Sequence, residues 1–257
     1  MRAPLPDWMR DRFERVDGPD AAAIVRADFR EAFEAHGLFG CAGPGDAAGA
    51  PLRAGGRGDA RVLPAGALGE VVVRPFRRGG WVRHFVRDRY LGGNRAFREI
   101  VLTERLRRAG APVPEALAAV QSRVGPGPVY AACLVTRRAA GFAPAAEVLR
   151  GLRPGEAAGH LERIGAAIRR THEAGGAHAD LNAWNVLVAV GRPGLSPILI
   201  DWDRGRWREG GVTPRRARAN LARLRRSFRK LGLAAALGAW EALERGYASG
   251  PEPVPAA

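Results

Sequence analysis

The sequence is poor in cysteine and has no long apolar run. Its 257 residues include only Cys41 and Cys133, too few for a disulfide framework or a four-thiolate zinc site. This cysteine usage fits a reducing compartment such as the cytoplasm. No stretch approaches the ~18 uninterrupted apolar residues that a membrane-spanning helix needs. Residues 1–17 carry acidic side chains and no apolar core segment, so we expect no secretory signal there.

Lysine is the other scarce residue. Lys230 is the only one, although Lys and Arg together number 41 against 26 Asp and Glu, for a formal net charge of +15. A Walker A phosphate loop needs a Gly-Lys pair, and Lys230 follows Arg229, so that loop is excluded. The arginine excess is typical of a GC-rich genome, and it still attracts anionic partners such as nucleic acid, anionic lipid or phosphorylated glycans. Charge alone does not choose among them.

The remaining composition predicts a folded α+β protein. With 46% hydrophobic residues the chain can bury a core, which excludes a disordered or collagen-like chain. Strand patterns crowd the first half and helical patterns the second, as in a protein of two lobes. Predicted strands lie near 59–63, 68–76, 115–121 and 129–136, and in a short hairpin with strands at 186–190 and 198–201. Predicted helices cover 20–36, 95–109 (capped by Asn94), 155–174 and 214–247.

These elements suggest three segments. Residues 1–50 are expected to form a helical extension followed by a Gly/Pro-rich segment. Residues 51–138 are expected to form a β-rich, nucleotide-binding N-lobe. Residues 139–257 are expected to form a helical C-lobe that carries the catalytic loop.

The segment HADLNAWNVLV, followed by ILIDWD, places three chemistry-bearing groups around one predicted hairpin. Asp180 lies in a loop, Asn185 follows five residues later at the mouth of the hairpin, and Asp201 leaves its second strand. A carboxylate that accepts a hydroxyl proton, beside an amide and a carboxylate that hold Mg²⁺, is what phosphoryl transfer from ATP requires. We therefore expect Asp180 to be the catalytic base, and Asn185 with Asp201 to be metal ligands.

This pattern resembles the kinase catalytic loop H-x-D-x-x-x-x-N with a downstream metal-binding aspartate. The resemblance places His178 in the active site, where we expect it to brace the catalytic loop. Arg74 lies on a predicted strand where kinases carry their phosphate-binding lysine, and the fork of an arginine also suits phosphate. Glu99 on the following helix is its expected partner. A candidate nucleotide loop precedes the first hairpin strand, with glycines at Gly55, Gly56 and Gly58.

Longer runs resemble one family. HADLNAWNVLV, ILIDWDRGR, RRGGWVRHFVRDRYL, FREIVLTERLRRAGAPVPEAL and ANLARLRRSFRK together resemble 3-deoxy-D-manno-octulosonic acid (Kdo) kinase, over roughly residues 50 to 232. The resemblance implies a two-lobed protein-kinase-like fold. It also implies ATP-dependent phosphorylation of the 4-hydroxyl of Kdo on a lipid A precursor at the cytoplasmic face of the inner membrane. Asp180 matches the family's active-site aspartate.

Two arginine clusters fit such an anionic acceptor, because arginine forks bind carboxylate and phosphate. They also fit a peripheral attachment to an anionic inner-membrane surface, where each basic residue adds about 1 kcal/mol of attraction. The first cluster is interleaved with Trp81, Phe85 and Tyr90. Its members are Arg74, Arg77, Arg78, Arg83, Arg87 and Arg89, and those of the second are Arg204, Arg206, Arg208, Arg215, Arg216 and Arg218.

Two alternatives stay open from the sequence. One is another kinase of the same fold, acting on a heptose, an aminoglycoside, another small molecule or a protein Ser/Thr. The run RRGGWVRHFVRDRYL argues against it, because that run resembles the Kdo branch and has no part in the shared chemistry. The other is a catalytically inactive basic binding protein. A protein of this kind that binds nucleic acid is not expected, because the sequence contains no RNA-binding aromatic motif and no zinc finger.

Overall fold

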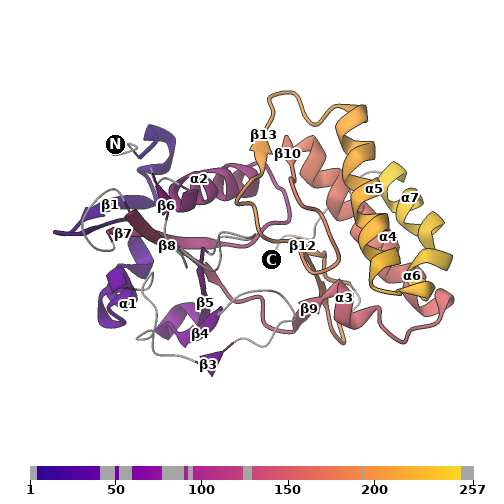
Figure 1. Cartoon of the computed structure of the whole chain (residues 1–257), viewed down its shortest axis with the longest axis horizontal. Coiled ribbons are helices and arrows are strands. Elements are labelled where there is room, and N and C mark those ends of the chain that lie inside the picture. Colours follow the sequence, from indigo (N-terminus) through magenta and orange to yellow (C-terminus); the bar gives the residue numbers. More distant parts are fainter. Residues whose placement is uncertain are drawn as a thin grey trace. The chain divides into compact units, whose positions relative to one another are not determined.

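The computed structural model describes residues 5–40, 50–51, 60–76, 90–91, 95–123, 129–192 and 194–249 (Figure 1). They form two compact units. Unit 1 comprises Met1–Glu104 and Glu115–Arg138, and unit 2 comprises Arg105–Pro114 and Ala139–Ala257. Unit 1 is rich in strands and unit 2 in helices, so the α+β class expected from the sequence is confirmed.

Unit 1 is built on one antiparallel sheet, whose described strands run in the order β1-β2-β7-β8-β5-β4-β3, with β6 paired to β8. Two α-helices belong to this unit, α1 (Arg30–Ala35) and the longer α2 (Arg95–Arg108). It also contains the short 3₁₀ helices η1 (Asp7–Met9), η2 (Ala27–Phe29), η3 (Leu38–Gly40) and η4 (Gly66–Leu68). The strands are β1 (Phe13–Asp17), β2 (Ala21–Arg26), β3 (Ala50–Pro51), β4 (Arg61–Pro64), β5 (Glu70–Pro75), β6 (Tyr90–Leu91), β7 (Ala116–Arg123) and β8 (Val129–Arg137).

Both faces of this sheet are covered, as strand β2 shows. Ala23 and Val25 belong to one core with Phe33 of α1, whereas Ile24 between them belongs to a second core with Phe97 of α2. This alternation is the period of two expected of a strand. Figure 1 shows α1 and α2 on opposite sides of the sheet.

The structure tests four of the sequence predictions for unit 1. The helix over 20–36 is wrong for its first part, because residues 21–26 form β2, and only Arg30–Ala35 is α-helical. The hairpin and the second strand pair are confirmed as β4–β5 and β7–β8. The helix over 95–109 is confirmed as α2, while its proposed cap, Asn94, lies outside the described residues.

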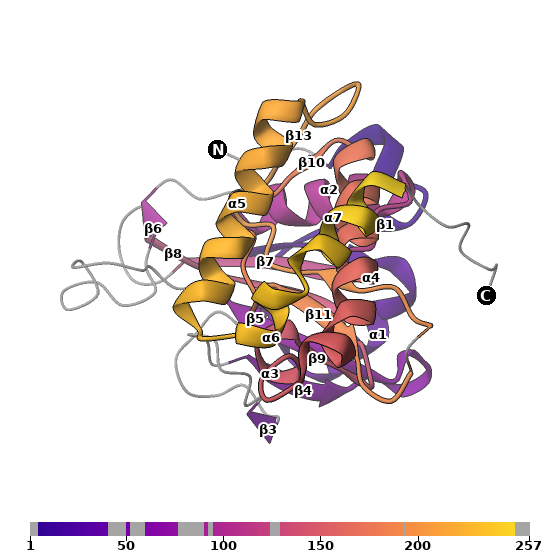
Figure 2. The same cartoon turned by 90° about the vertical axis from the view of Figure 1, so that its right-hand side faces the viewer.

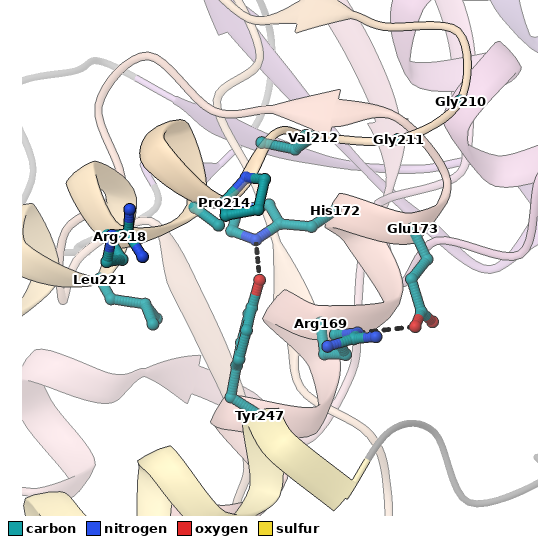
Figure 3. Close-up of a pocket in the computed structure, with 11 residues that line it drawn as sticks. Arg169, His172, Glu173, Gly210, Gly211, Val212, Pro214, Arg218, Leu221 and Tyr247 are labelled. Carbon is teal, nitrogen blue, oxygen red and sulfur yellow. Dashed lines mark hydrogen bonds and ion pairs between the residues drawn. The ribbon is translucent and has the colours of Figure 1, made fainter.

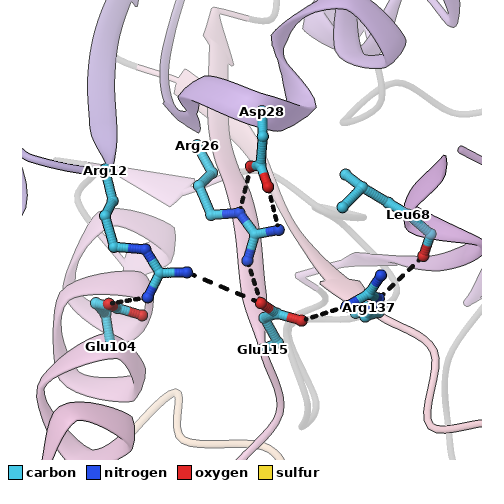
Figure 4. A network of polar contacts seen from close by, with 7 residues as sticks. All are labelled: Arg12, Arg26, Asp28, Leu68, Glu104, Glu115 and Arg137. Atoms are coloured by element: carbon cyan, nitrogen blue, oxygen red, sulfur yellow. Dashed lines mark hydrogen bonds and ion pairs between the residues drawn. The ribbon is translucent and has the colours of Figure 1, made fainter.

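A network of charged side chains ties the N-terminal strands to the rest of unit 1 (Figure 4). Arg26 of β2 is 4% exposed and forms ion pairs with Asp28 and Glu115. Arg12 and Arg137 also reach the Glu115 carboxylate, at 4.0 Å and 3.2 Å. Because Glu115 directly precedes β7 and Arg137 ends β8, this network joins β2 to the middle of the sheet.

Unit 2 contains a helical core and two small sheets. The sheets have the strand orders β12-β11-β9 and β10-β13. The helices are α3 (Ala145–Val148), α4 (Pro154–Glu173), α5 (Pro214–Lys230), α6 (Ala234–Gly238) and α7 (Trp240–Ser249), which Figure 2 shows together. The strands are β9 (Phe142–Pro144), β10 (Gly176–Ala177), β11 (Val186–Ala189), β12 (Ile198–Leu199) and β13 (Arg206–Trp207).

Glycines let α4 and α7 pack backbone to backbone. A Cβ atom on Gly246 of α7 would overlap the carbonyl oxygen of Glu162, and one on Gly165 of α4 would overlap that of Leu243. The predicted helix over 155–174 is confirmed as α4, and the helical region 214–247 is confirmed as α5, α6 and α7. Gly232, with a φ of +67°, follows the end of α5 and allows the chain to turn.

Candidate active site

The loop of residues 178–185 lies between β10 and β11 and is held in shape by its own side chains. The Asn182 side-chain oxygen accepts hydrogen bonds from the backbone N–H groups of Trp184 (2.9 Å) and Asn185 (3.2 Å). Its amide nitrogen donates to the backbone oxygen of Asp180 (3.0 Å) and to Asp180 Oδ2 (3.1 Å). Asn182 therefore fixes both the turn and the carboxylate of Asp180, whose side chain is 65% exposed.

The same loop brings Asn185 next to the exit of β12. Asn185 Nδ2 donates to the backbone oxygen of Asp180 at 2.9 Å, and its own carbonyl accepts the N–H of Ile200 at 3.0 Å. Asp201 follows Ile200 directly and has a φ of +66°, a left-handed conformation that aspartate and asparagine tolerate better than most residues. The structure thus brings Asp180, Asn185 and Asp201 to one end of the β11–β12 hairpin.

The His178 side chain connects the loop that carries Asp180 to the end of β12, which Asp201 follows. Its Nδ1 accepts the backbone N–H of Asp180 at 3.1 Å, and its Nε2 lies 2.9 Å from the carbonyl oxygen of Ile200. A backbone N–H can only donate, so the ring proton is on Nε2. Burial lowers the pKa of His178, and the ring packs edge-on against Trp202 with 4.6 Å between centroids. His178 is a neutral bridge from the loop of Asp180 to the strand exit that carries Asp201.

A buried polar relay supports the loop from behind. Asn220 Nδ2 of α5 donates to the carbonyl oxygen of His178 at 2.8 Å, which turns its Oδ1 toward His172 Nε2 at 3.1 Å. His172 of α4 therefore carries its proton on Nε2, and its Nδ1 accepts the hydroxyl of Tyr247 at 2.9 Å (Figure 3). In this arrangement both ring nitrogens of the neutral His172 have a hydrogen-bond partner.

We expect this relay to make the protein sensitive to acid. Burial lowers the pKa of His172 from 6.5 to about 4. The unfolded chain therefore binds a proton between these pH values that the folded chain does not, so stability is full above pH 6.5 and falls as the pH drops toward 4. The loss amounts to about 3 kcal/mol in the free energy of unfolding, and His178 adds to it with the same sign.

Nuclear magnetic resonance can check this expectation directly. The imidazole C–H signal of His172, assigned by its loss in His172→Gln, should stay at its neutral position down to about pH 5. Denaturant unfolding at pH 7 and pH 5 should show lower stability at pH 5. Titration of His172 near pH 6.5 would contradict the relay.

The donors at this end of the hairpin suit Mg²⁺. The described residues contain no group of three or more His, Cys, Asp and Glu side chains that could hold a metal ion. Mg²⁺ is, however, commonly held by one or two carboxylates together with substrate phosphates and waters. The Nδ2 of Asn185 donates a hydrogen bond within the loop, so Oδ1 is the atom with which Asn185 could bind a metal ion, and Asp201 offers a carboxylate beside it. Asp203 is a weaker candidate because it lies two residues farther along.

In unit 1 the structure brings together Arg74 and Glu99. Arg74 Nη2 of β5 lies 2.6 Å and 2.7 Å from the two carboxylate oxygens of Glu99 on α2. Glu99 is 2% exposed and Arg74 29%, so the pair has one buried and one partly accessible member. The Arg74 guanidinium also lies over the ring of Phe76, 4.8 Å from its centroid.

Other predicted site residues lie outside the described part of the chain. These are Gly55, Gly56 and Gly58 of the candidate nucleotide loop. The same holds for most of the first arginine cluster and its aromatics, namely Arg77, Arg78, Trp81, Arg83, Phe85, Arg87 and Arg89.

The sequence analysis missed three residues of α5 that contact the loop. Asn220 binds the His178 carbonyl, Ser227 Oγ accepts the N–H of Ala183 at 3.1 Å, and Arg223 Nη1 lies 3.6 Å from Asp180 Oδ1. Their spacing of three and four residues places them on one face of a helix, which was the only signal available in the sequence.

Comparison with known proteins identifies the class to which this fold and site belong. The profile described as "Lipopolysaccharide kinase (Kdo/WaaP) family" matches residues 48–247. The chain belongs to this family, and it is therefore a kinase of lipopolysaccharide biosynthesis, a sugar kinase that uses ATP.

Individual proteins similar to this chain include two kinases of known name and one solved structure. The 3-deoxy-D-manno-octulosonic acid kinase of Xylella fastidiosa (strain M12) is 39% identical over 207 residues, 76% of each chain. The enzyme of the same name from Xanthomonas euvesicatoria pv. vesicatoria (strain 85-10) is 40% identical over 195 residues, 70% of each chain. Among solved structures, WaaP in complex with acyl carrier protein has a TM-score of 0.55 at 19% identity and covers 89% of both chains. This last likeness confirms the expected kinase-like fold.

Proposed function

We propose that this chain transfers the γ-phosphoryl group of ATP to the 4-hydroxyl of the Kdo residue of a Kdo–lipid A precursor. The names of the relatives at about 40% identity support the acceptor. The observation that carries the proposal is the convergence of Asp180, Asn185 and Asp201 on one hairpin end, with His178 hydrogen-bonded to both sides.

Each residue has a part in the reaction. Asp180, exposed and oriented by Asn182, accepts the proton of the acceptor hydroxyl. Asn185 Oδ1 and the Asp201 carboxylate are the groups that would hold Mg²⁺, which when bound neutralises charge on the ATP phosphates. His178 stays neutral, and its two hydrogen bonds hold the loop of Asp180 in place beside the end of β12. Arg74, oriented by Glu99, binds phosphate oxygens of ATP.

Replacement of Arg74 tests the last assignment. Arg74→Ala should raise the KM for ATP and lower the rate, because the guanidinium fork that would bind the phosphates is lost together with its ion pair to the buried Glu99. Arg74→Lys should be partly active, since lysine supplies charge without the fork. Steady-state kinetics with varied ATP, together with thermal unfolding of each variant, measure the effect. Normal ATP kinetics in Arg74→Ala would show that Arg74 does not serve the nucleotide.

The acceptor can be tested by locating the new phosphate. Purified protein is incubated with ATP, Mg²⁺ and either Kdo–lipid A precursor, the same precursor with 4-deoxy-Kdo, or a heptose-terminated acceptor. Tandem mass spectrometry should find one added phosphate on Kdo in the first case and none in the second. Phosphate on the 4-deoxy compound or on heptose alone would overturn the assignment of the acceptor position.

We also propose that the enzyme works as a peripheral protein on the anionic cytoplasmic face of the inner membrane. No helix in the described ranges is long and apolar enough to cross a bilayer. Helix α5 could attach the protein to anionic lipid, because its sequence is rich in arginine and contains no acidic residue. Its exposed basic side chains are Arg215, Arg216, Arg218, Arg223, Arg225, Arg226, Arg229 and Lys230.

Vesicle sedimentation tests this attachment. The protein should pellet with anionic vesicles at low salt and be released near 1 M salt, where the Debye length falls from ~10 Å to ~3 Å. Charge reversal to Glu at Arg215, Arg216 and Arg229 should weaken pelleting without changing ATP affinity. The matched control reverses three exposed arginines outside α5, Arg98, Arg150 and Arg192. An equal loss of pelleting in both variants would contradict an attachment through α5. Pelleting that does not change with salt concentration would also contradict it.

A further inference from the structure

Among the residues that the structure describes, the cation paired with the proposed catalytic base comes from a helix that follows the catalytic loop in sequence. Arg223 of α5 places Nη1 3.6 Å from Asp180 Oδ1, and it is the only ion-pair partner of Asp180 among the residues that the structure describes. Residues 178–185 contain no Lys or Arg. The loop therefore depends on α5 for positive charge at this point.

The fold holds α5 against the loop at several points. Asn220 binds the carbonyl of His178, and Ser227 binds the N–H of Ala183, so bonds on either side of Arg223 fix the helix to both ends of the loop. Leu224 and Phe228, on the same side of α5, are fully buried. The position of Arg223 beside Asp180 is thus set by packing and hydrogen bonds that do not involve its own side chain.

Arg223 is not needed to orient Asp180. The carboxylate already accepts a hydrogen bond from Asn182, and the Asp180 backbone is held by His178, Asn182 and Asn185. The separation of 3.6 Å is longer than a hydrogen bond. The side chain of Arg223 is 46% exposed, so its guanidinium is accessible beside the carboxylate that meets the substrate.

We propose that Arg223 is a catalytic residue that contacts the phosphoryl group during its transfer, an inference that rests on the proposed kinase function. As the acceptor oxygen forms its bond to the γ-phosphorus, the bond from phosphorus to the oxygen of the leaving ADP breaks, and the hydroxyl proton passes to Asp180. The phosphorus is then bonded directly to the oxygen that Asp180 deprotonates, so the phosphoryl oxygens lie two bonds from that oxygen. A guanidinium within 4 Å of that carboxylate can bind them and stabilise their charge.

Four proteins test this role, namely wild type, Arg223→Ala, Arg223→Lys and Arg150→Ala. Arg150 is an exposed arginine of the same unit that lies outside α5, and it serves as the control for loss of charge. We expect Arg223→Ala to lower kcat about 10²-fold with little change in the KM for ATP. Arg223→Lys should recover part of kcat, and added guanidinium should raise the rate of Arg223→Ala but not that of Asp180→Asn. Arg150→Ala should match wild type.

The outcomes separate this inference from the proposed function. If wild type fails to phosphorylate Kdo–lipid A precursor, the proposed function fails. If wild type is active and Arg223→Ala retains its kcat, changes KM alone, or is rescued by neither lysine nor guanidinium, the role of Arg223 is overturned and the proposed function stands. Circular dichroism of each variant shows that the comparison is made between folded proteins.

Discussion

Asp180→Asn will lower the turnover number by about 10² to 10⁴-fold, which is the usual contribution of a general base, while ATP binding is retained. Asparagine has the size of aspartate but cannot accept the proton of the acceptor hydroxyl. The backbone oxygen of Asp180, which receives the hydrogen bonds of Asn182 and Asn185, is unchanged by the substitution. The side chain is 65% exposed, so the fold should tolerate the change.

Turnover and nucleotide binding should be measured on the same preparation. Single-turnover transfer from ATP reports the chemical step, and isothermal titration calorimetry reports ATP affinity. Glu209→Gln, which removes an exposed carboxylate of the same unit, is the control for charge loss and should behave as wild type. Wild-type turnover in Asp180→Asn would show that this carboxylate is not the base.

Asp201→Asn will reduce activity by about 10² to 10³-fold, on the scale of losing one preorganised electrostatic contact, and will raise the Mg²⁺ concentration needed for half-maximal rate. Asparagine is the suitable replacement because residue 201 has a φ of +66°, and asparagine tolerates this conformation. Alanine would add backbone strain to the loss of charge. The asparagine variant therefore isolates the metal-binding role of the carboxylate.

The metal dependence distinguishes this effect from misfolding. Mg²⁺-dependent ATP binding, followed by calorimetry without any acceptor, should weaken in Asp201→Asn and remain nearly normal in Asp203→Asn. The rate should be partly restored at high Mg²⁺ concentration. A larger effect at Asp203 than at Asp201 would mean that the other carboxylate is the ligand.

Local patterns account for what the sequence predicted well. The order His178, Asp180, Asn185 and Asp201 lies within one loop and one hairpin, so their proximity follows from short-range geometry. Helix α2 and strands β4, β5, β7 and β8 carry clear periodicity and turn signals, and they form close to the expected bounds. The sequence pattern also predicts the fold class, which the likeness to WaaP confirms.

Long-range pairing explains the main error. The spacing of the apolar residues Ile24, Phe29 and Phe33 among charged ones predicts a helix over 20–36, and the alanines of the run AAAIV are compatible with a helix. In the structure Ala23 pairs with Val120 of β7, and the small alanines fit a strand that is covered on both faces. Such a tertiary constraint overrides local propensity, and it depends on a strand about a hundred residues farther along.

The residues of α5 that contact the loop could not be predicted from the sequence, because these contacts are also long-range. Asn220, Arg223 and Ser227 lie some 40 residues beyond the loop that they contact, on a helix whose sequence is dominated by arginine. Nothing local distinguishes Arg223 from its neighbours. The packing of Leu224 and Phe228, together with the hydrogen bonds of Asn220 and Ser227, sets which face of α5 meets the loop.

The most direct test of the central claim is transfer of label from [γ-³²P]ATP to Kdo–lipid A precursor by the purified wild-type protein. We predict that one labelled phosphate appears on the Kdo sugar in the presence of Mg²⁺, and that Asp180→Asn, assayed beside it, produces almost none. Labelled product formed equally by both proteins would contradict the assignment of Asp180, and the absence of labelled Kdo with the wild type would contradict the proposed function itself.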